Sequence, residues 1–168
     1  YSTDEYYYYG GALVDQLTGY NGEDNITYDS IGNPLTYYNG ASYTFTWQRG
    51  RQLATATKGS YNLSFTYNDA GIRTSKTVNG VKHTYYLSGS QIMAESYGTQ
   101  LYIYLYDAAG SPIGMRYRTS SMEEGVFHTY WYEKNLQGDV IGVYNESGAR
   151  LISYDYDAWG RMNTGVGN

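Results

Sequence analysis

The sequence of 168 residues has no cysteine, two prolines, three phenylalanines and few long aliphatic side chains. The absence of cysteine excludes a disulfide scaffold and any thiolate metal site. No run approaches the ~18 apolar residues that a membrane span needs, so no span is expected. Residues 1–4 lack the basic and apolar character of a signal peptide, so none is expected within the chain.

Positive charge is also scarce. Eleven lysines and arginines face 16 acidic residues, which gives a formal net charge of −5 and an isoelectric point near 4.9. Non-specific nucleic-acid binding requires clustered Lys and Arg. We therefore expect no nucleic-acid partner.

Tyrosine and glycine are abundant instead, with 24 and 21 copies. Because long aliphatics are few, tyrosine must supply much of the buried surface. Tyrosine favours strands, where its ring packs on the sheet and its hydroxyl reaches a wet edge. The length suits roughly one domain, and the composition predicts an all-β fold.

An aromatic residue, a polar residue and a glycine recur along the chain. The aromatic positions are Tyr28, Trp47, Tyr67, Tyr86 and Tyr106, at steps of 19, 20, 19 and 20 residues. The matching glycines are Gly32, Gly50, Gly71, Gly89 and Gly110, and Asp29 and Asp107 follow the first and last aromatics. Later the step shortens to 12, where Tyr132, Tyr144 and Tyr156 precede Gly138, Gly148 and Gly160.

Each copy is typical of a strand that enters a tight turn and then a second strand. Aromatic and small polar residues alternate over 43–47 and 61–67, which predicts one buried and one wet face. After the aromatic, Asp or Asn can bond the backbone two residues on, and Gly supplies the positive φ. Asn39-Gly40 and Asn79-Gly80 predict hairpins between copies.

These patterns predict about two strands for every 20 residues and no helix of three turns within residues 26–110. The signature aromatics should be mostly buried and should recur at equivalent places, as in stacked repeats. The small polar tail from residue 162 onward is expected to contain no strand.

The repeats resemble the Rhs/YD-repeat family, whose signature is a Tyr-Asp pair followed by a glycine turn every ~20 residues. A more specific block follows: Asn135, Gly138 and Asp139 lie in Asn-Leu-Gln-Gly-Asp, and Tyr156, Asp157, Trp159 and Gly160 lie in Tyr-Asp-Ala-Trp-Gly. This block is similar to the opening of the Rhs-associated core domain. The resemblance divides the chain into a YD-repeat strip at 1–125 and the beginning of the core region at 126–168, continuous with the strip.

The resemblance implies a curved strip of antiparallel β-hairpins, a segment of a spiralling β-shell around the C-terminal toxin of a polymorphic toxin or, in teneurins, around other material. It also implies a secreted or cell-surface bacterial protein. The partners would be the rest of the parent protein and its toxin, and exposed sheet edges would favour self-association. The aspartyl autoproteolysis motif of the family has no counterpart here, so no catalytic residue and no cofactor are expected.

Other groups that could carry chemistry have a structural interpretation. Asp155 and Asp157 would share a strand face but belong to turns. His83 and His128 are the only histidines, and a metal site usually needs more ligands. Ser120 and Ser121 lie in a polar loop without a nucleophile elbow.

Carbohydrate binding is the alternative function, because rows of exposed tyrosine can stack on sugar rings. In this hypothesis the chain is an adhesin-like repeat module. A hydrolase is a third, weaker hypothesis.

Overall fold

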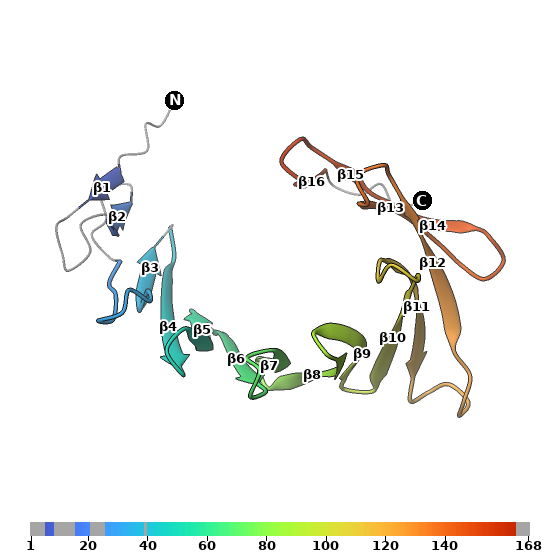
Figure 1. The fold of residues 1–168 in the computed structure, drawn as a ribbon, viewed down its shortest axis with the longest axis horizontal. Helices are drawn as coiled ribbons and strands as arrows, with labels where there is room; N and C mark the ends of the chain where they lie inside the picture. The colour runs from blue at the N-terminus through green and yellow to red at the C-terminus, as the bar shows by residue number, and fades with distance from the viewer. Residues whose placement is uncertain (1–5, 9–15, 21–25, 39, 164–168) are drawn as a thin grey trace. The chain divides into compact units, whose positions relative to one another are not determined.

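The computed structural model describes residues 6–8, 16–20, 26–38 and 40–163, and it contains strands and turns but no helix in these ranges (Figure 1). The prediction of an all-β chain is therefore confirmed. Contacts divide the chain into two compact units, Tyr1–His83 and Thr84–Asn168. No helix of the described residues is long and apolar enough to cross a membrane.

The first unit contains a strand pair and the start of the main sheet. Its strands are β1 (Tyr6–Tyr8), β2 (Leu17–Tyr20), β3 (Thr36–Tyr38), β4 (Ser42–Gln48), β5 (Gln52–Lys58), β6 (Tyr61–Tyr67), β7 (Arg73–Val78) and the beginning of β8 (Val81–Ser88). Residues 1–5, 9–15, 21–25 and Asn39 of the first predicted hairpin turn lie outside the described residues.

The second unit continues with hairpins of the same kind. Its strands are β9 (Gln91–Tyr97), β10 (Gln100–Tyr106), β11 (Pro112–Thr119), β12 (His128–Lys134), β13 (Val140–Tyr144), β14 (Arg150–Ser153), β15 (Asp155–Tyr156) and β16 (Met162–Asn163). Strands β3 to β14 follow the sequence order in a twelve-stranded sheet, and the pairs whose register is described are antiparallel. The expectation of a tail without a strand was wrong, because Met162 and Asn163 pair with β15.

Burial alternates along β4, as the sequence predicts: Tyr43, Phe45 and Trp47 are half-buried, and the residues between them are exposed. Strand β10 differs, because every residue from Gln100 to Tyr106 is half-buried. Only Ile26 and Val143 are buried apolar residues in the described part of the chain. The sheet is therefore stabilised by many partly covered side chains rather than by one dense core.

Six turns of the described chain share one hydrogen-bond pattern. In each turn, the backbone carbonyl of the first residue accepts a hydrogen bond from the backbone N–H of the glycine three residues later. The backbone N–H of that first residue donates to the backbone carbonyl four residues later. These turns begin at Asp29, Asn68, Asp107, Asn135, Asn145 and Asp157. In Asp107, side-chain Oδ1 also accepts the N–H groups of Ala109 and Ser111, both at 2.9 Å. The predicted turn chemistry is confirmed.

The copies at Trp47 and Tyr86 use a different turn. There, short hairpin loops join the strands: residues 49–51 lie between β4 and β5, and residues 89–90 lie between β8 and β9. Gly50 and Gly89 have positive φ, 85° and 59°, and Arg49 also has positive φ, 45°. The two turn types alternate, so equivalent positions lie 39 residues apart, as Tyr28, Tyr67 and Tyr106 do. Strands β9, β10 and β11 likewise begin 39 residues after strands β5, β6 and β7, respectively. The structural repeat is thus a four-stranded unit, twice the step seen in the sequence.

Most signature aromatics fix one strand to an earlier one through a side-chain donor. The Tyr67 hydroxyl donates to the Leu53 carbonyl at 2.9 Å, and the Tyr106 hydroxyl makes the equivalent bond to Ile92, 39 residues on. Trp47 donates its indole N–H to the Pro34 carbonyl at 2.7 Å.

Tyr86 contradicts the prediction that all these aromatics are mostly buried, because it is 52% exposed. Its hydroxyl lies 3.4 Å from that of Ser96 and bonds no carbonyl among the described residues. The other four aromatics are half-buried, which fits side chains that cover a sheet from one side.

Candidate functional site

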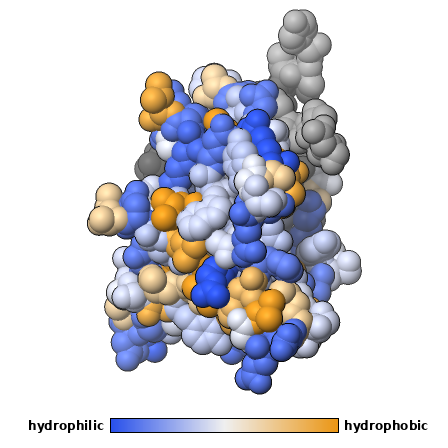
Figure 2. Space-filling model, turned by 90° about the vertical axis from the view of Figure 1, so that its right-hand side faces the viewer, coloured by the Kyte–Doolittle hydropathy of each residue, from blue (hydrophilic) through white to orange (hydrophobic). Residues whose placement is uncertain are grey.

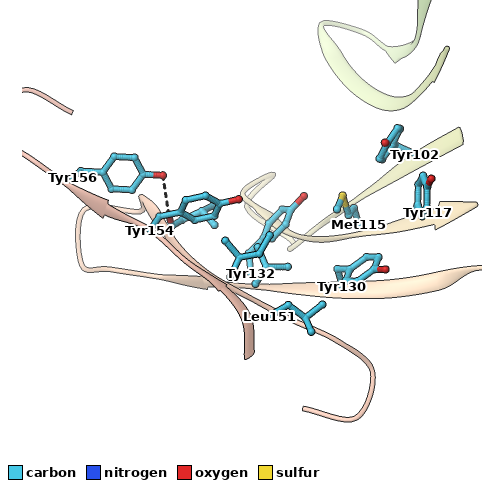
Figure 3. A pocket seen from close by; sticks show the side chains of 11 residues that line it. Tyr102, Met115, Tyr117, Tyr130, Tyr132, Leu151, Tyr154 and Tyr156 are labelled. Carbon is cyan, nitrogen blue, oxygen red and sulfur yellow. Dashed lines mark hydrogen bonds between the residues drawn. The ribbon is translucent and has the colours of Figure 1, made fainter. Parts of the chain in front are cut away.

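The second unit contains an open hollow of about 660 Å³ over strands β10 to β14 (Figure 3). Tyrosine dominates its lining, with methionine and branched aliphatic residues beneath. The lining residues are Tyr102, Met115, Tyr117, Tyr130, Tyr132, Val140, Val143, Leu151, Ile152, Tyr154 and Tyr156.

Strand register brings these side chains to one face. Tyr102 pairs with Tyr117, and Met115 pairs with Tyr130 on the next strand. Further along, Val143 lies between Tyr132 and Ile152. Since partners in a ladder point to the same side of a sheet, alternate residues of five strands converge on the hollow.

Ring contacts hold part of the lining in place. The Tyr102 ring stacks on Tyr97 at 5.8 Å between centroids and lies 5.0 Å from Tyr117. Its hydroxyl donates to Gln100 Oε1 at 2.6 Å. The Tyr156 hydroxyl donates to the Val140 carbonyl at 3.0 Å, which fixes β15 to β13. Offset aromatic pairs of this kind stabilise by about 0.5–1.5 kcal/mol beyond area burial.

Three phenols of this face, those of Tyr102, Tyr104 and Tyr132, have a raised pKa. Burial raises the pKa of Tyr102, and the neighbouring Tyr97 hydroxyl raises it further. Burial also raises the pKa of Tyr104, followed by the charge of Glu95, to whose carboxylate the Tyr104 hydroxyl donates. The pKa of Tyr132 is raised chiefly by burial. Such groups offer hydrogen bonds without charge.

The lining contains no carboxylate, imidazole, amine or amide side chain. Histidine, carboxylate and lysine side chains are the commonest general acids and bases, and none lines the hollow. The hollow therefore suits an apolar or aromatic surface with occasional hydrogen-bonding groups.

The structure separates most of the signature residues from this hollow. Of the aromatic residues of the repeats, Tyr132 and Tyr156 line it. Tyr28, Trp47, Tyr67 and Tyr106 bond the backbone carbonyls of earlier residues. Asp29, Asp107, Asn135, Asp139 and Asp157 lie in the repeated turns. The turn glycines all have positive φ: Gly32, Gly50, Gly71, Gly89, Gly110, Gly138, Gly148 and Gly160.

Two further signature residues lie elsewhere on the second unit. Tyr144 donates its hydroxyl to Glu133 Oε2 at 3.2 Å on the opposite side of the sheet. Trp159 is 93% exposed at the tip of its turn. The sequence did not distinguish these positions from the residues that link strands.

Two of the groups weighed for chemistry lie in local turns. Asp157 Oδ1 accepts the N–H groups of Trp159 and Arg161, both at 2.9 Å. Ser121 lies in a local turn, where its hydroxyl is 2.6 Å from that of Thr119. No group of three or more metal-binding side chains occurs in the parts of the chain described above.

Sequence reasoning did not find the hollow, although a signal for it exists. Tyrosines two residues apart occur at Tyr102 and Tyr104, Tyr130 and Tyr132, and Tyr154 and Tyr156. In strands this spacing places both rings on one face. The pattern does not say which strands become neighbours, so the convergence depends on the register.

Curated proteins of Bacillus match the chain over most of its length. It is 32% identical over 157 residues to the tRNA3(Ser)-specific nuclease WapA of Bacillus spizizenii, and 30% identical over 155 residues to the tRNA nuclease WapA of Bacillus subtilis. Each match covers 88% of this chain. The chain belongs to the Rhs/YD-repeat family. This Rhs/YD-repeat chain spans about 6% of the length of these relatives, and no family model matches it.

Solved structures share the fold at lower identity. A crystal structure of TcdB2-TccC3-Cdc42 matches with a TM-score of 0.60 at 17% identity, over 98% of this chain and 10% of that one. A structure of the Photorhabdus luminescens Tc holotoxin pore gives 0.59 at 16% identity, over 95% of this chain and 10% of that one. These matches agree with the antiparallel sheet of this Rhs/YD-repeat chain.

Proposed function

We propose that the chain is a non-enzymatic wall segment of a Rhs/YD-repeat shell that encloses a C-terminal toxin or effector for delivery. The observation that carries this proposal is the uncharged, tyrosine-lined hollow on one face of a sheet built from consecutive hairpins. Such a face can contact a polypeptide cargo through rings and neutral hydroxyls. The parent protein would be secreted or displayed at the bacterial surface.

Under this proposal residues 1–125 form the repeat strip, and residues 126–168 begin the core region without interrupting the sheet. The nuclease activity named for the WapA relatives would belong to another part of the parent protein. In this chain, the turn carboxylates Asp29, Asp107 and Asp157 are engaged with backbone N–H groups. Their geometry supports a structural role.

The hollow does not favour the alternative of carbohydrate binding at a tyrosine row. A sugar presents a hydroxyl on most ring carbons, and its recognition needs several precisely placed polar partners. The lining offers phenols but no carboxylate, amide or guanidinium. An apolar or aromatic partner suits it better.

Cysteine labelling of the parent protein tests which face lies inside. Tyr117 and Arg116 are neighbours on β11, and register places Tyr117 with the hollow and Arg116 on the opposite face. Because this chain has no cysteine, Tyr117→Cys and Arg116→Cys can be compared in a parent protein without other accessible thiols. We expect a bulky maleimide to modify Arg116→Cys and to spare Tyr117→Cys.

The isolated 168-residue chain is the matched control, since both cysteines should react when no shell encloses the hollow. Equal labelling rates of the two cysteines in the intact parent protein would refute the enclosed-face assignment. Limited proteolysis of each variant, compared with the wild type, checks that the substitution leaves the sheet folded.

A further inference from the structure

Two tyrosines near the tip of the β9–β10 hairpin meet through both their rings and their hydroxyls. The ladder pairs Tyr102 with Glu95, two residues before Tyr97 on β9, so Tyr97 and Tyr102 are diagonal neighbours on one face of the sheet. Their ring planes are 13° from parallel, with centroids 5.8 Å apart. Their hydroxyl oxygens lie 3.3 Å apart. Because the oxygens are closer than the centroids, the rings approach each other at their ortho carbons, the carbons beside the phenolic C–O bond.

The hydrogen bonds of this pair have a defined direction. The Tyr102 hydroxyl donates to Gln100 Oε1 at 2.6 Å. A phenol has a single O–H donor, so Tyr97 donates and Tyr102 accepts in the contact between the two phenols. Tyr102 also lines the open hollow, where the Tyr117 ring lies 5.0 Å from it (Figure 3). A small molecule in the hollow can therefore reach the edge of the pair.

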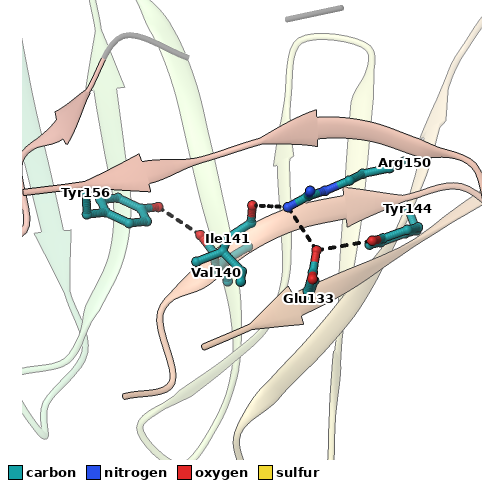
Figure 4. Close-up of polar contacts among 6 residues, drawn as sticks. All are labelled: Glu133, Val140, Ile141, Tyr144, Arg150 and Tyr156. Carbon is teal, nitrogen blue, oxygen red and sulfur yellow. Dashed lines mark hydrogen bonds and ion pairs between the residues drawn. The ribbon is translucent and has the colours of Figure 1, made fainter. Parts of the chain in front are cut away.

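Another tyrosine pair of the second unit lacks this arrangement. The rings of Tyr154 and Tyr156 lie 6.4 Å apart with 29° between their planes. The Tyr156 hydroxyl donates to the Val140 carbonyl at 3.0 Å rather than to a phenol (Figure 4). Near-parallel rings and adjoining phenol oxygens together distinguish Tyr97 and Tyr102 from that pair.

We propose that Tyr97 and Tyr102 form a dityrosine cross-link when the chain meets a one-electron oxidant of the kind that a haem peroxidase makes from hydrogen peroxide. Each phenol loses one electron and its O–H proton, and the two phenoxyl radicals join through their ortho carbons. The hydrogen on each joined carbon then leaves as a proton while the phenolic oxygen takes one up, which restores both aromatic rings. The chain thus loses two electrons and two protons, which reduce one hydrogen peroxide to two water molecules.

The cross-link would supply a kind of bond that this chain otherwise lacks. Without cysteine, the chain can form no disulfide. Only Gly98 and Thr99 connect β9 to β10, so a bond between Tyr97 and Tyr102 would hold the two strands together beside their turn. This modification acts on the sheet itself and does not depend on what the hollow encloses.

Oxidation of the dilute 168-residue chain with photogenerated tris(bipyridine)ruthenium(III) tests the proposal. This diffusible oxidant removes one electron at a time, and added persulfate is the final electron acceptor. Monomer isolated by size exclusion is then cleaved after Lys, Arg and Glu, which leaves both tyrosines in one peptide spanning residues 96–116. We expect that peptide to lose two hydrogen atoms and to give no backbone fragments between Tyr97 and Tyr102 in mass spectrometry.

Links between molecules are one competing product, because other tyrosines are exposed, as Tyr61 is at 60%. Figure 2 shows a face on which hydrophobic side chains lie in small groups among hydrophilic ones rather than as one broad patch. Association through such a face is weak. Dilution should therefore suppress links between molecules and leave the internal link unchanged.

Other products within one molecule differ in mass or position. A link from Tyr102 to Tyr117 would join two peptides, because cleavage after Arg116 separates these tyrosines. Oxidation of Met115 adds an oxygen atom to the peptide and does not imitate the loss of two hydrogens.

Conservative variants identify the two phenols. Tyr97→Phe and Tyr102→Phe should each abolish the link, since phenylalanine forms no phenoxyl radical. Tyr104→Phe is the matched control: Tyr104 lies on the same peptide, its hydroxyl donates to Glu95, and its loss should leave the link in place. Circular dichroism checks that each variant is folded.

Three results would overturn the proposal. One is the absence of the internal link from oxidised wild-type chain in which other tyrosines have coupled. Another is persistence of the link in Tyr97→Phe. The third is an equal yield in the folded chain and in the chain unfolded in urea, because the fold would then have no part in pairing the rings. None of these results bears on cysteine labelling of the hollow, so the two proposals fail separately.

Discussion

The tyrosine hydroxyl that bonds an earlier strand is expected to contribute measurably to stability in both units. Tyr67→Phe removes the donor to the Leu53 carbonyl, and Tyr106→Phe removes the equivalent donor to Ile92. Each substitution should lower the free energy of unfolding by about 0.5–1.5 kcal/mol, the net value of one neutral hydrogen bond. Tyr67→Ala should lower it by about 2–3 kcal/mol, below the range for a fully buried aromatic, because the ring is half-buried.

Urea denaturation followed by circular dichroism measures these losses, with hydrogen exchange to locate each in its own unit. Tyr61→Phe is the control, because Tyr61 is 60% exposed and its hydroxyl has no partner in the described residues. That variant should stay within about 0.5 kcal/mol of the wild type. If Tyr67→Phe and Tyr106→Phe are as silent as Tyr61→Phe, the hydroxyl bonds do not stabilise the repeat.

Further predictions concern turns, pH and sheet edges. Gly71→Ala and Gly148→Ala should each cost about 1–2 kcal/mol in thermal or urea unfolding, because φ is +79° and +80°. Gly71→Ala should cost slightly more, since its Cβ meets Gln52 Nε2 at 3.3 Å; equal melting with wild type would contradict this. Burial raises the pKa of Tyr132 above 10.0, so its stabilising contribution is complete below pH 10 and is lost as pH rises through the folded pKa. Tyr132→Phe should therefore raise the midpoint of alkaline unfolding, followed by circular dichroism. At Asp29, burial disfavours the charged form, but bonds from Asn33, Ile31 and Gly32 together outweigh it and lower the pKa. Its contribution is thus present above the unfolded pKa and lost as pH falls through the folded one, so Asp29→Asn should weaken the acid sensitivity of unfolding. Leu151→Lys, on terminal strand β14, should reduce self-association in sedimentation, since charge on an edge opposes strand pairing.

Local chemistry made the strands and turns predictable. An Asp or Asn three residues before a glycine dictates its own turn, because the side chain and the positive φ act within five residues. The alternation of turn types also has a signal in the sequence, which the regular step of the aromatics conceals. Gly71 follows Tyr67 by four residues and Asn68 comes directly after that tyrosine, whereas Gly50 follows Trp47 by three residues and Gln48 comes directly after that tryptophan.

Two features of the sheet depend on the register between strands and could not be predicted from the sequence. In the sequence, Gly114 and Gly142 cannot be distinguished from the turn glycines, yet each lies within a strand beneath a β12 side chain. The opposite face of β6 differs from expectation for a related reason. Thr66 is exposed, but its hydroxyl lies 2.7 Å from that of the buried Ser75. Thr66→Ala would therefore cost more than a solvated position implies.

Tyrosine stabilises this sheet in place of buried aliphatic residues, which are scarce. A sheet that is partly covered on its faces cannot rely on dense packing, and only Ile26 and Val143 are buried apolar residues in the described chain. A tyrosine ring covers the sheet surface, and its hydroxyl reaches a carbonyl on a strand that leucine could not bond. Because the link made by Tyr67 returns 39 residues later at Tyr106, each four-stranded unit supplies its own bonds, and a wall can grow by repeating that unit without enlarging a core.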